Sequence, residues 1–458
     1  MTTNKKVKPA QPGGFNDYGP AAMIARGRMI DTIRRVYELY GFQPLDTPCV
    51  EFSEVLLGDG GETEKEIFRL TGPEEDKELA LRFDLTVALS RYVAANTDLL
   101  MPFKRYQVGN VFRGEKPQAG RFRQFLQVDA DVVGAKTGLA DAEIIAVTAA
   151  AMAGLGIERF VVRINDRKIH DGLAAAVGID ARGPLTRGEM VNELLRVLDK
   201  LEKIGRPGVR AELMKKPEYE ADRALHLSAE QVALVERFLD IAGDNGEKLA
   251  RAEALVRGET GAAGIAELRE ILADLRALGW DERVEVDLTV ARGLEYYTGP
   301  VLETRLLDLP EIGSVASGGR YDEMIGRFHA NAIPAVGTSI GLDRLFDALQ
   351  RLQLVTTVES EVDALIIVFD AKYTATYLDY LRRLRAAGIS AEIYLGSDSG
   401  FKAQMRYGLR KGVKHLVICG EDEIAQGGVQ VKNLATRNQE FVPAERLLAY
   451  LRQPAVSA

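Results

Sequence analysis

Arginine is concentrated in one short stretch of the chain, residues 105–123, around a turn that contains Pro117 and two glycines. Guanidinium groups match phosphate or carboxylate oxygens two at a time, and they stay charged at any working pH. This stretch is therefore predicted to bind a polyanion. A solvated basic turn on an ordinary hairpin would have the same composition, but here the arginines are flanked by aromatic residues typical of a buried environment, which favours a site.

The residues on both sides of this turn are predicted to hold the arginines in place. Residues 105–112 and 122–133 alternate between apolar and polar positions, as in strands, and 114–120 form the turn between them. A hairpin of this kind places Arg113 at the end of its first strand. Three further cations then lie on or beside the turn: Lys116, Arg121 and Arg123.

Four stretches resemble the signatures of one enzyme family. FRGEKPQAGRFRQF at 112–125 is similar to motif 2 of class II aminoacyl-tRNA synthetases, in particular the histidyl enzymes. RGLEYYTGP at 292–300 and SGGRYD at 317–322 resemble the two histidine-binding signatures of that family, and AVGTSIGLDRL at 335–345 resembles its motif 3. The resemblance extends over nearly the whole chain in the expected order.

This resemblance implies a reaction and a fold. The chain would activate histidine with ATP, giving histidyl-adenylate and pyrophosphate, and would then transfer histidine to the 3′ end of tRNA(His). Mg²⁺ would bridge the β- and γ-phosphates of ATP. The implied fold is α+β: an antiparallel-sheet catalytic core with a helical insertion and a C-terminal α/β anticodon-binding domain. A helix over 21–40 and the proline-bearing stretch after it resemble motif 1, which implies a homodimer.

The resemblance also assigns residues to ATP. Arg113 would bridge the histidine carboxylate and the α-phosphate, and Arg292 would act on that phosphate from the opposite side, so both are candidate catalytic residues. Arg344, in the first turn of a predicted helix, would hold the γ-phosphate, where the helix dipole adds to its attraction. Glu115 would accept from the adenine amino group, and Phe125 would stack on the adenine ring with Arg344 on its other face.

An imidazole needs hydrogen-bond partners for both ring nitrogens and an aromatic wall. Asp131, Tyr297 and Tyr321 would supply these, although tyrosines at strand ends can also be core residues. Asp84 and Thr86 would meet the amino group, but both types also cap helices, and a helix is predicted from Val87. The implied histidine-binding set is Asp84, Thr86, Arg113, Gln127, Asp131, Arg292, Tyr296, Tyr297 and Tyr321.

The turn departs from the commoner family pattern. Lys116 stands where an arginine is usual, Gly114 replaces a bulkier residue, and Asp131 stands where the longer Glu is frequent. Exchange of Arg for Lys at a bidentate site is not conservative. We therefore expect intact activation chemistry with altered reading of the tRNA acceptor end. The residues expected to meet that end are Lys116, Gln118, Arg121 and Arg123.

The order of patterns divides the chain. Residues 284–290 alternate like a strand, and Ser228 with Gln231 forms a capping-box signature within an almost purely helical region. From Ala364 onward the predicted order is strand, helix, strand, helix, strand, strand and helix. The last region carries a basic helix face from Lys402 to Lys414, which is usually a solvated surface. The predicted parts are 1–183 and 280–352 for the catalytic core, 184–279 for the insertion, 353–362 for a linker and 363–458 for the anticodon-binding domain.

Composition restricts the function classes. The formal net charge of -8 argues against nonspecific nucleic-acid binding, so contact with tRNA would need local basic patches. Cys49 and Cys419 are far apart and the four histidines show no ligand spacing, so we expect neither a disulfide nor a metal held by protein side chains. The chain lacks a signal-peptide pattern and any run near the ~20 apolar residues that span a bilayer, which predicts a cytoplasmic protein without membrane contact.

Three alternatives stay open on the sequence. A synthetase-like regulatory subunit of ATP phosphoribosyltransferase shares this core, but it lacks the last domain and usually degrades the signatures. Here Arg113, Arg292 and Arg344 are all present. The second alternative is a sister synthetase for another amino acid, and the two histidine signatures count against it. The third is a regulatory protein that keeps the fold, and the intact arginines count against it.

Overall fold

The computed structural model describes residues 7–57, 66–72, 77–117, 120–136, 138–291 and 297–453. Internal contacts divide the chain into two compact units, Met1–Asp17 with Arg28–Val355, and Tyr18–Gly27 with Thr356–Ala458. The first unit carries the candidate site, and the second contains a separate α/β sheet. Within the described ranges, no helix is both long enough and apolar enough to cross a membrane.

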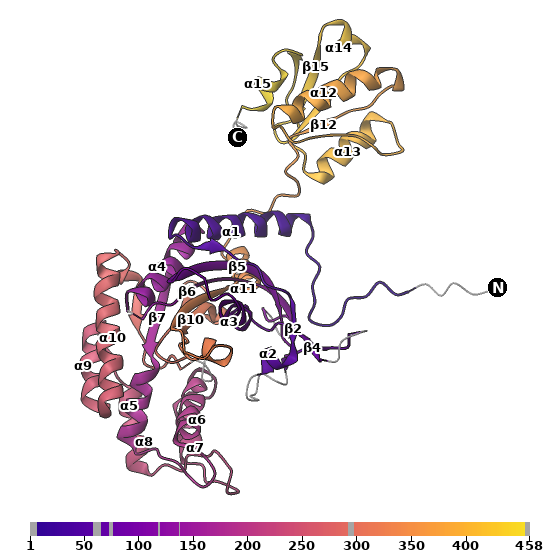
Figure 1. Cartoon of the computed structure of the whole chain (residues 1–458). Helices are drawn as coiled ribbons and strands as arrows, with labels where there is room; N and C mark the ends of the chain where they lie inside the picture. Colours follow the sequence, from indigo (N-terminus) through magenta and orange to yellow (C-terminus); the bar gives the residue numbers. More distant parts are fainter. Residues whose placement is uncertain are drawn as a thin grey trace, which may run out of the picture. The chain divides into compact units, whose positions relative to one another are not determined.

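In the first unit the described residues form an eight-stranded sheet (Figure 1). Its central strands are antiparallel, and the outer strands β1 and β8 pair in parallel with their neighbours. The predicted antiparallel core is therefore confirmed. In spatial order the strands are β1 (Gln43–Pro44), β5 (Phe103–Phe112), β6 (Gln124–Val133), β11 (Ala335–Gly341), β10 (Ser314–Arg320), β9 (Pro300–Leu306), β7 (Phe160–Asp166) and β8 (Val284–Val286).

Helices cover this sheet and bury its apolar side chains. The predicted first helix is present, and the buried Tyr37 in its second half lies with its ring centroid 6.1 Å from that of Tyr106 on β5. The Tyr37 hydroxyl donates to the Val128 carbonyl of β6, at 3.4 Å. Each large apolar side chain buried in this way contributes roughly 1.5–3 kcal/mol. The helices are α1 (Pro20–Leu39), α4 (Gly138–Gly154) and α11 (Leu342–Arg351).

A small second sheet leads into helix α3 beside the main sheet. Leu85, directly before α3, is fully buried, and Val87 and Leu89 of the helix belong to an apolar cluster that includes Tyr321. This packing holds Asp84 and Thr86 near the end of β10. The elements are β2 (Val50–Phe52), α2 (Ser53–Leu57), β3 (Arg69–Leu70), β4 (Leu79–Leu81) and α3 (Thr86–Ala95).

Helices dominate the region after β7. The predicted capping box is present, because the Ser228 side chain accepts from the Gln231 N–H and Gln231 reaches back to the Ser228 N–H. Two glycines allow α5 and α10 to approach closely, since a Cβ on Gly172 would lie 2.7 Å from the Cα of Gly261. The helices are α5 (Arg167–Val177), α6 (Arg187–Asp199), α7 (Leu201–Met214), α8 (Ala229–Leu239), α9 (Asn245–Leu255) and α10 (Gly258–Ala277).

The strand predicted over 284–290 is shorter than its alternation suggested. Strand β8 stops at Val286. The Asp287 carboxylate then accepts hydrogen bonds from the N–H and the hydroxyl of Thr289, at 3.0 and 2.6 Å. This side-chain bonding forms a turn that competes with the sheet. Leu288 and Val290 are nevertheless buried, so the apolar pattern reflects burial outside a strand.

The second unit contains the predicted order of strands and helices and two elements more. Helix α14 and strand β16 were missed; β16 exposes all of its side chains but Val442 and ends at Pro443, so it shows no alternation. Strands β12, β13 and β14 are parallel, and β15 and β16 extend the sheet antiparallel. The elements are β12 (Ala364–Ile366), α12 (Thr374–Ala386), β13 (Ala391–Ile393), α13 (Phe401–Lys411), β14 (His415–Ile418), α14 (Glu421–Ala425), β15 (Gly428–Asn433), β16 (Gln439–Pro443) and α15 (Leu447–Leu451).

Candidate active site

The predicted hairpin is present as β5 and β6, and its register decides which side chains share a face. Arg105 lies opposite Asp131 and Gln107 lies opposite Asp129, with Gln127 two residues earlier on β6. Because successive side chains of a strand point to opposite faces, these odd-numbered residues all lie on one side of the sheet. The even-numbered residues of β5 and β6 face the other side, where α1 packs.

The next two strands continue this face with small residues. On β11, Gly337 lies opposite Asp131, and Ser339 follows two residues later on the same face. On β10, Gly319 lies opposite Gly337. A Cβ on Gly337 would stand 1.9 Å from the Asp131 Oδ1, and one on Gly319 would stand 3.0 Å from the Tyr297 ring. Both positions must therefore lack a side chain.

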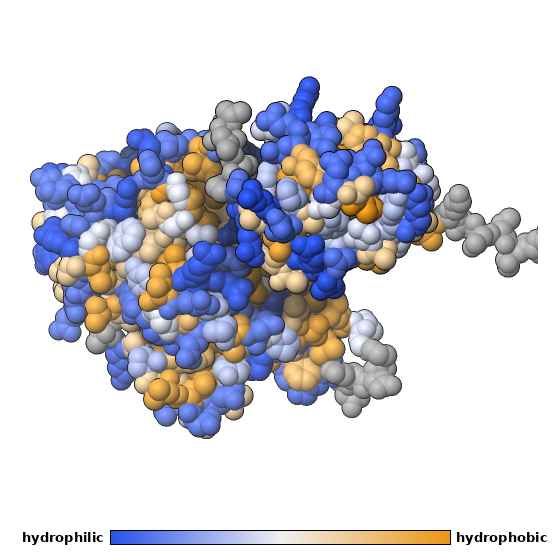
Figure 2. Space-filling model, turned by 90° about the horizontal axis from the view of Figure 1, so that it is seen from above, coloured by the Kyte–Doolittle hydropathy of each residue, from blue (hydrophilic) through white to orange (hydrophobic). Residues whose placement is uncertain are grey.

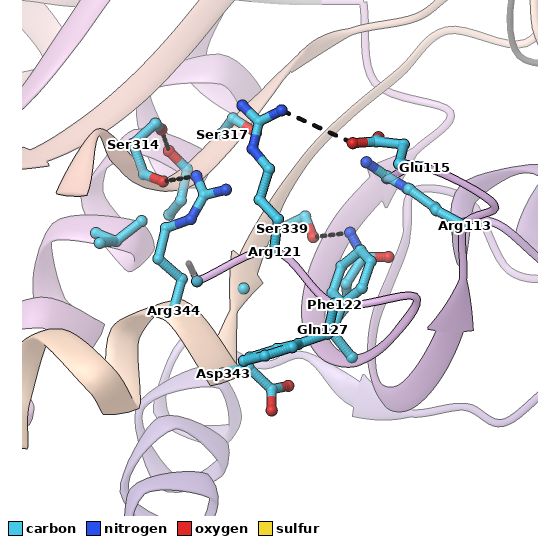
Figure 3. A pocket seen from close by; sticks show the side chains of 15 residues that line it. Arg113, Glu115, Arg121, Phe122, Gln127, Ser314, Ser317, Ser339, Asp343 and Arg344 are labelled. Carbon is cyan, nitrogen blue, oxygen red and sulfur yellow. Dashed lines mark hydrogen bonds and ion pairs between the residues drawn. The ribbon is translucent and has the colours of Figure 1, made fainter. Parts of the chain in front are cut away.

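An open pocket of about 230 Å³ lies where this face meets the hairpin turn and the start of α11 (Figure 3). Three cations and two acids from segments far apart in the sequence line it, together with the rings of Phe122 and Phe125 and several hydroxyl groups. The lining includes Arg113, Glu115, Arg121, Phe125, Gln127, Ser314, Ser317, Ser339, Asp343 and Arg344.

The three arginines of the pocket are oriented by neighbouring groups. The Arg113 Nε donates to the Phe83 carbonyl at 3.2 Å, and its guanidinium carbon lies 5.2 Å from the Phe125 ring centroid. The Arg344 Nη1 donates to the Ser314 carbonyl at 2.7 Å, and Arg121 pairs with Glu115 at 3.7 Å (Figure 3). Several donors of these groups face the same opening, which suits a ligand with several anionic oxygens.

Two short bonds join the walls of the pocket. The Asp343 Oδ2 accepts the Leu126 N–H at 2.7 Å, which fixes the start of α11 against β6. The Gln127 Nε2 donates to the Ser339 Oγ at 2.8 Å, which joins β6 to β11 across the pocket floor. The bond to the Asp343 carboxylate contributes about 1.5–3 kcal/mol to this arrangement, and the neutral bond between Gln127 and Ser339 contributes about 0.5–1.5 kcal/mol.

Beyond Gln127 the face becomes acidic and more deeply buried. The hydroxyl of Tyr321 donates to Asp131 Oδ1, and the Arg105 Nη2 lies 2.8 Å from Asp131 Oδ2. Arg105 is 0% exposed and Asp131 2% exposed, so this ion pair is removed from solvent. The structure therefore brings two of the residues expected around the imidazole, Asp131 and Tyr321, into direct contact. Tyr297 packs over Gly319 beside them.

Asp84 and Thr86 lie at the start of α3, on the edge of the same region. The Asp84 Oδ1 accepts the Val87 N–H at 3.1 Å, so Asp84 caps the first turn of α3 from the residue before the N-cap, Leu85. Its second role is not excluded, because one carboxylate accepts several hydrogen bonds. Burial raises the pKa of Asp84, while the Val87 N–H and the charges of Arg113 and Arg105 act in the opposite direction.

Asp129 is a second buried acid on this face. Burial raises the pKa of Asp129 to about 7. The charge of Arg105 opposes this rise, the charge of Asp131 adds to it, and the hydrogen bond with Ser339 lowers the pKa again. Burial also raises the pKa of Asp131, with Arg105 as the strongest opposing influence. A full set of ionised acids is therefore costly here without a cation among them.

Other predicted residues lie elsewhere or beyond the described ranges. Arg123 donates to the carbonyls of Glu115 and Gly13, at 3.0 and 3.4 Å, and it is absent from the pocket lining. Lys116 is exposed on the turn. Three further predicted residues fall outside the described ranges: Gln118, Arg292 and Tyr296.

Sequence reasoning missed several polar residues of this face. Arg105, Asp129 and Ser339 were not predicted, although Asp129 lies two residues from both Gln127 and Asp131. Strand alternation carried this signal, because a residue two positions from a predicted ligand lies on the same face. Gly337 left no such signal, since its role depends on the partner strand. Within the described residues, no group of three or more His, Cys, Asp or Glu side chains is arranged to hold a metal ion.

Comparisons with known proteins agree with these features. Residues 14–345 match the family described as histidyl-tRNA synthetase, and residues 363–454 match an anticodon binding domain. A relative from Xanthomonas oryzae, named histidine--tRNA ligase, is 41% identical over 97% of this chain and 97% of its own length.

Solved structures show the same likeness. A histidyl-tRNA synthetase from Nostoc sp. PCC 7120 superposes with a TM-score of 0.84 at 34% identity, over 98% of this chain and 99% of that one. A Bacillus halodurans protein described as an ATP phosphoribosyltransferase regulatory subunit/histidyl-tRNA synthetase has a TM-score of 0.72 at 24% identity, over 88% of this chain and 97% of its own. At that identity the second likeness concerns the fold alone.

Replacement of Asp129 by Asn tests the cost of this buried acid. Between about pH 4 and pH 7 the folded chain holds a proton on Asp129 that the unfolded chain has released, so wild-type stability falls as the pH rises through this window. Asn cannot ionise, so the free energy of unfolding of Asp129→Asn should not fall in this way. Relative to the wild type it is expected to rise by up to about 1.4 kcal/mol per pH unit across the window. Urea unfolding at pH 5 and pH 8 measures the difference.

The exposed Asp98 provides the matched control, since Asp98→Asn makes the same chemical change at a solvated position. A stability difference between Asp129→Asn and the wild type that is the same at pH 5 and pH 8 would contradict this account of the site.

Proposed function

The chain belongs to the histidyl-tRNA synthetase family, and we propose that the face described above binds histidine and ATP next to each other for the first step of its reaction. The protein is an aminoacyl-tRNA ligase, which joins histidine to ATP as histidyl-adenylate with release of pyrophosphate and then transfers histidine to the 3′ end of tRNA(His). One observation carries the residue assignment: three arginines converge on a pocket lined by Gln127, and the same face of β6 continues from Gln127 to Asp131, which contacts Tyr321.

Adenylate formation brings two anions together. A carboxylate oxygen of histidine attacks the α-phosphorus of ATP, and the bond to pyrophosphate breaks as the new P–O bond forms. Positioned cations stabilise the charge that develops on the phosphate oxygens, and they do so without reorganising during the reaction. Arg113, held between Phe83 and Phe125, would bridge the carboxylate and the α-phosphate. Arg292 is assigned to the opposite side of that phosphate on the family resemblance alone.

The rest of ATP would lie along the pocket toward α11. Arg344, held by the Ser314 carbonyl in the first turn of that helix, would bind the γ-phosphate. Phe125 would stack on adenine, and Glu115, which lines the same pocket, would accept from the adenine amino group. Mg²⁺ would come with the nucleotide and offset the charge of its β- and γ-phosphates, because the pocket itself is rich in arginines.

Histidine would occupy the region between this pocket and the buried acids. Asp131 and Tyr321, already in contact, would meet the ring nitrogens, and Tyr297 would form the aromatic wall. Gln127, between the two regions, would reach the amino acid from the pocket floor. A site built to bond both nitrogens rejects apolar isosteres, because they leave buried polar groups without partners. Asp84 and Thr86 would receive the amino group, with Tyr296 beside the ring.

The tRNA would contact both units. We assign its acceptor end to the turn of β5 and β6, with Lys116, Gln118, Arg121 and Arg123 as the contact residues, and its anticodon to the second unit. Lys402, Arg406 and Arg410 of α13 support the second assignment, whereas Lys411 and Lys414 near them pair with acids. Aminoacylated tRNA is used by the ribosome, and we therefore propose that the protein is located in the cytoplasm.

The regulatory-subunit alternative is less well supported. Such a subunit would lack the last domain, whereas residues 363–454 match an anticodon binding domain. It would also tend to lose the nucleotide-binding residues, whereas Arg113 and Arg344 both line the pocket.

Exchange of pyrophosphate into ATP, with each of the twenty amino acids and without tRNA, tests the activation step. Histidine alone is expected to support exchange. Arg113→Ala and Arg292→Ala should each lower the rate by about 10²–10³-fold, as expected when a group that stabilises transition-state charge is removed. Arg276→Ala, which removes an exposed arginine far from the pocket lining, is the control and should keep the wild-type rate. Exchange with another amino acid, or none at all, would contradict the assignment.

Charging of tRNA(His) with and without its extra 5′ guanosine tests the altered acceptor-end reading. We expect removal of that nucleotide to lower kcat/KM by less than about tenfold, equivalent to about 1.4 kcal/mol. Lys116→Arg restores the planar guanidinium group and should make kcat/KM depend more strongly on the extra 5′ guanosine. A loss on removing the guanosine as strong as in ordinary family members would show that the reading is unchanged.

We also propose a homodimer, on the resemblance of α1 and the following stretch to motif 1. Large apolar side chains are exposed there, including Leu39, Val50 and Phe52. On the face shown in Figure 2, apolar residues gather in patches among hydrophilic ones. Sedimentation should give twice the chain mass at micromolar concentration, and Leu39→Glu should weaken the dimer because it places a charge in an apolar contact. A stable monomer at that concentration would rule the proposal out.

A further inference from the structure

We propose that Arg105 is a positioning residue for histidine recognition: its buried guanidinium holds the Asp131 carboxylate ionised and in the orientation that receives an imidazole N–H. This inference rests on the proposed role of Asp131. It concerns a residue that lies behind the amino-acid site and that none of the family signatures above includes.

The geometry around Arg105 points to this role. The side chain is 0% exposed and lies directly opposite Asp131 in the strand register, so both project from the same face. Its Nη2 is 2.8 Å from Asp131 Oδ2 and 3.3 Å from the Leu85 carbonyl, and its Nη1 is 3.5 Å from the Gln107 Oε1. Leu85 stands between Asp84 and Thr86. One guanidinium therefore connects the acid expected to bind the ring with the segment expected to bind the amino group.

The orientation of Asp131 leaves one oxygen for a substrate. Its Oδ1 accepts from the Tyr321 hydroxyl. Its Oδ2, although close to Arg105, accepts no well-aligned hydrogen bond within the described part of the chain and is buried. A buried carboxylate oxygen that lacks an aligned donor carries a cost, which a ring N–H would remove. Gly337 supports the same orientation, because any side chain there would displace Asp131.

Charge compensation explains why an arginine is needed. Asp84, Asp129 and Asp131 are all buried, and burial disfavours the ionised form of each. Arg105 acts against this on all three. The groups that face Asp131 are Arg105 from β5, Asp129 from β6, and Tyr321 and Tyr297 from the segments at the end of β10, with Tyr37 of α1 also within electrostatic reach. Loss of Arg105 would remove the strongest influence that favours the ionised form of Asp131.

The test measures KM for histidine and KM for ATP separately in pyrophosphate exchange. Arg105→Met is expected to raise the histidine KM by roughly 10–100-fold, the range for losing a hydrogen bond to a charged group, while the ATP KM changes less than about twofold. Arg105→Lys keeps the charge but not the fork, and should show a smaller increase of the same kind.

Arg82→Lys is the matched structural control. Arg82 is also a buried arginine, 2% exposed, but its donors bind the carbonyls of Thr47 and Asn110. We expect this variant to lose stability without a selective change in the histidine KM. If the Arg105 variants raise both KM values together, or leave the histidine KM unchanged, the proposal is overturned. If both Arg105 variants fail to fold while Arg82→Lys folds, the proposal is overturned as well, because Arg105 would then be needed for the stability of the sheet.

A pH profile gives a second readout that a merely structural role would not move. In the double variant Arg105→Met/Asp129→Asn, Asp131 is the acid left on β6. The ratio of its histidine KM to that of the wild type should fall as the pH rises, because a higher pH favours the ionised form of Asp131 when its arginine is absent. A ratio that does not change with pH contradicts the proposal.

The role of Asp131 itself is tested separately by Asp131→Asn. A wild-type histidine KM in that variant would refute the assignment of Asp131. A large increase there, combined with no effect at Arg105, would refute this inference alone. Absence of histidine-dependent exchange in the wild type would refute the proposed function instead.

Discussion

In an antiparallel sheet each strand sends alternate side chains to opposite faces, so β5, β6, β11 and β10 must supply a hydrophobic core and a polar site from the same residues in turn. Tyr106 and Val128 belong to the side packed against α1, whereas Arg105 and Gln127 belong to the other. A shift of register by one residue would exchange the two faces. The apolar packing of one side therefore fixes the positions of the polar groups on the other.

This arrangement also explains why glycine is needed at particular strand positions. Side chains on neighbouring strands stand directly opposite one another, so an acid that lies flat against the sheet requires an empty position beside it. Asp131 lies over Gly337, and Tyr297 lies over Gly319. These glycines weaken the strands that contain them, and the loss is offset because β10 and β11 are paired on both sides within the sheet. Space for a ligand is in this way created without opening the sheet.

Much of the fold follows from the sequence because burial and alternation act locally. The hairpin at β5 and β6, the first helix and the capping box at Ser228 depend on neighbours in the chain, and all are present. The strand predicted beyond Val286 failed because the Asp287 side chain forms a competing turn, and β16 left no signal because only Val442 on it is buried. Local patterns cannot decide either outcome.

The site was less predictable, because its residues act in pairs from separate strands. Arg113 and Arg344 could be identified by resemblance, but the contact of Arg105 with Asp131 depends on register, which periodicity along one strand does not give. Asp84 differs from Arg105, because its capping role could be predicted from the local sequence. The capping bond is present in the structure, but it does not decide whether Asp84 also binds substrate.

The charges on the polar face are separated along β6 in a way that matches the two substrates. Arg113, Arg121 and Arg344 gather at one end, and Asp84, Asp129 and Asp131 gather at the other, with the neutral Gln127 between them. In histidine the carboxylate, the ammonium group and the side chain leave one α-carbon in different directions, so the carboxylate can face the arginines while the ammonium group and the ring face the acids. The reverse orientation would place like charges together. Burial raises the pKa of all three acids and Arg105 acts against that rise, so the role that we propose for Arg105 is to keep negative charge at this end.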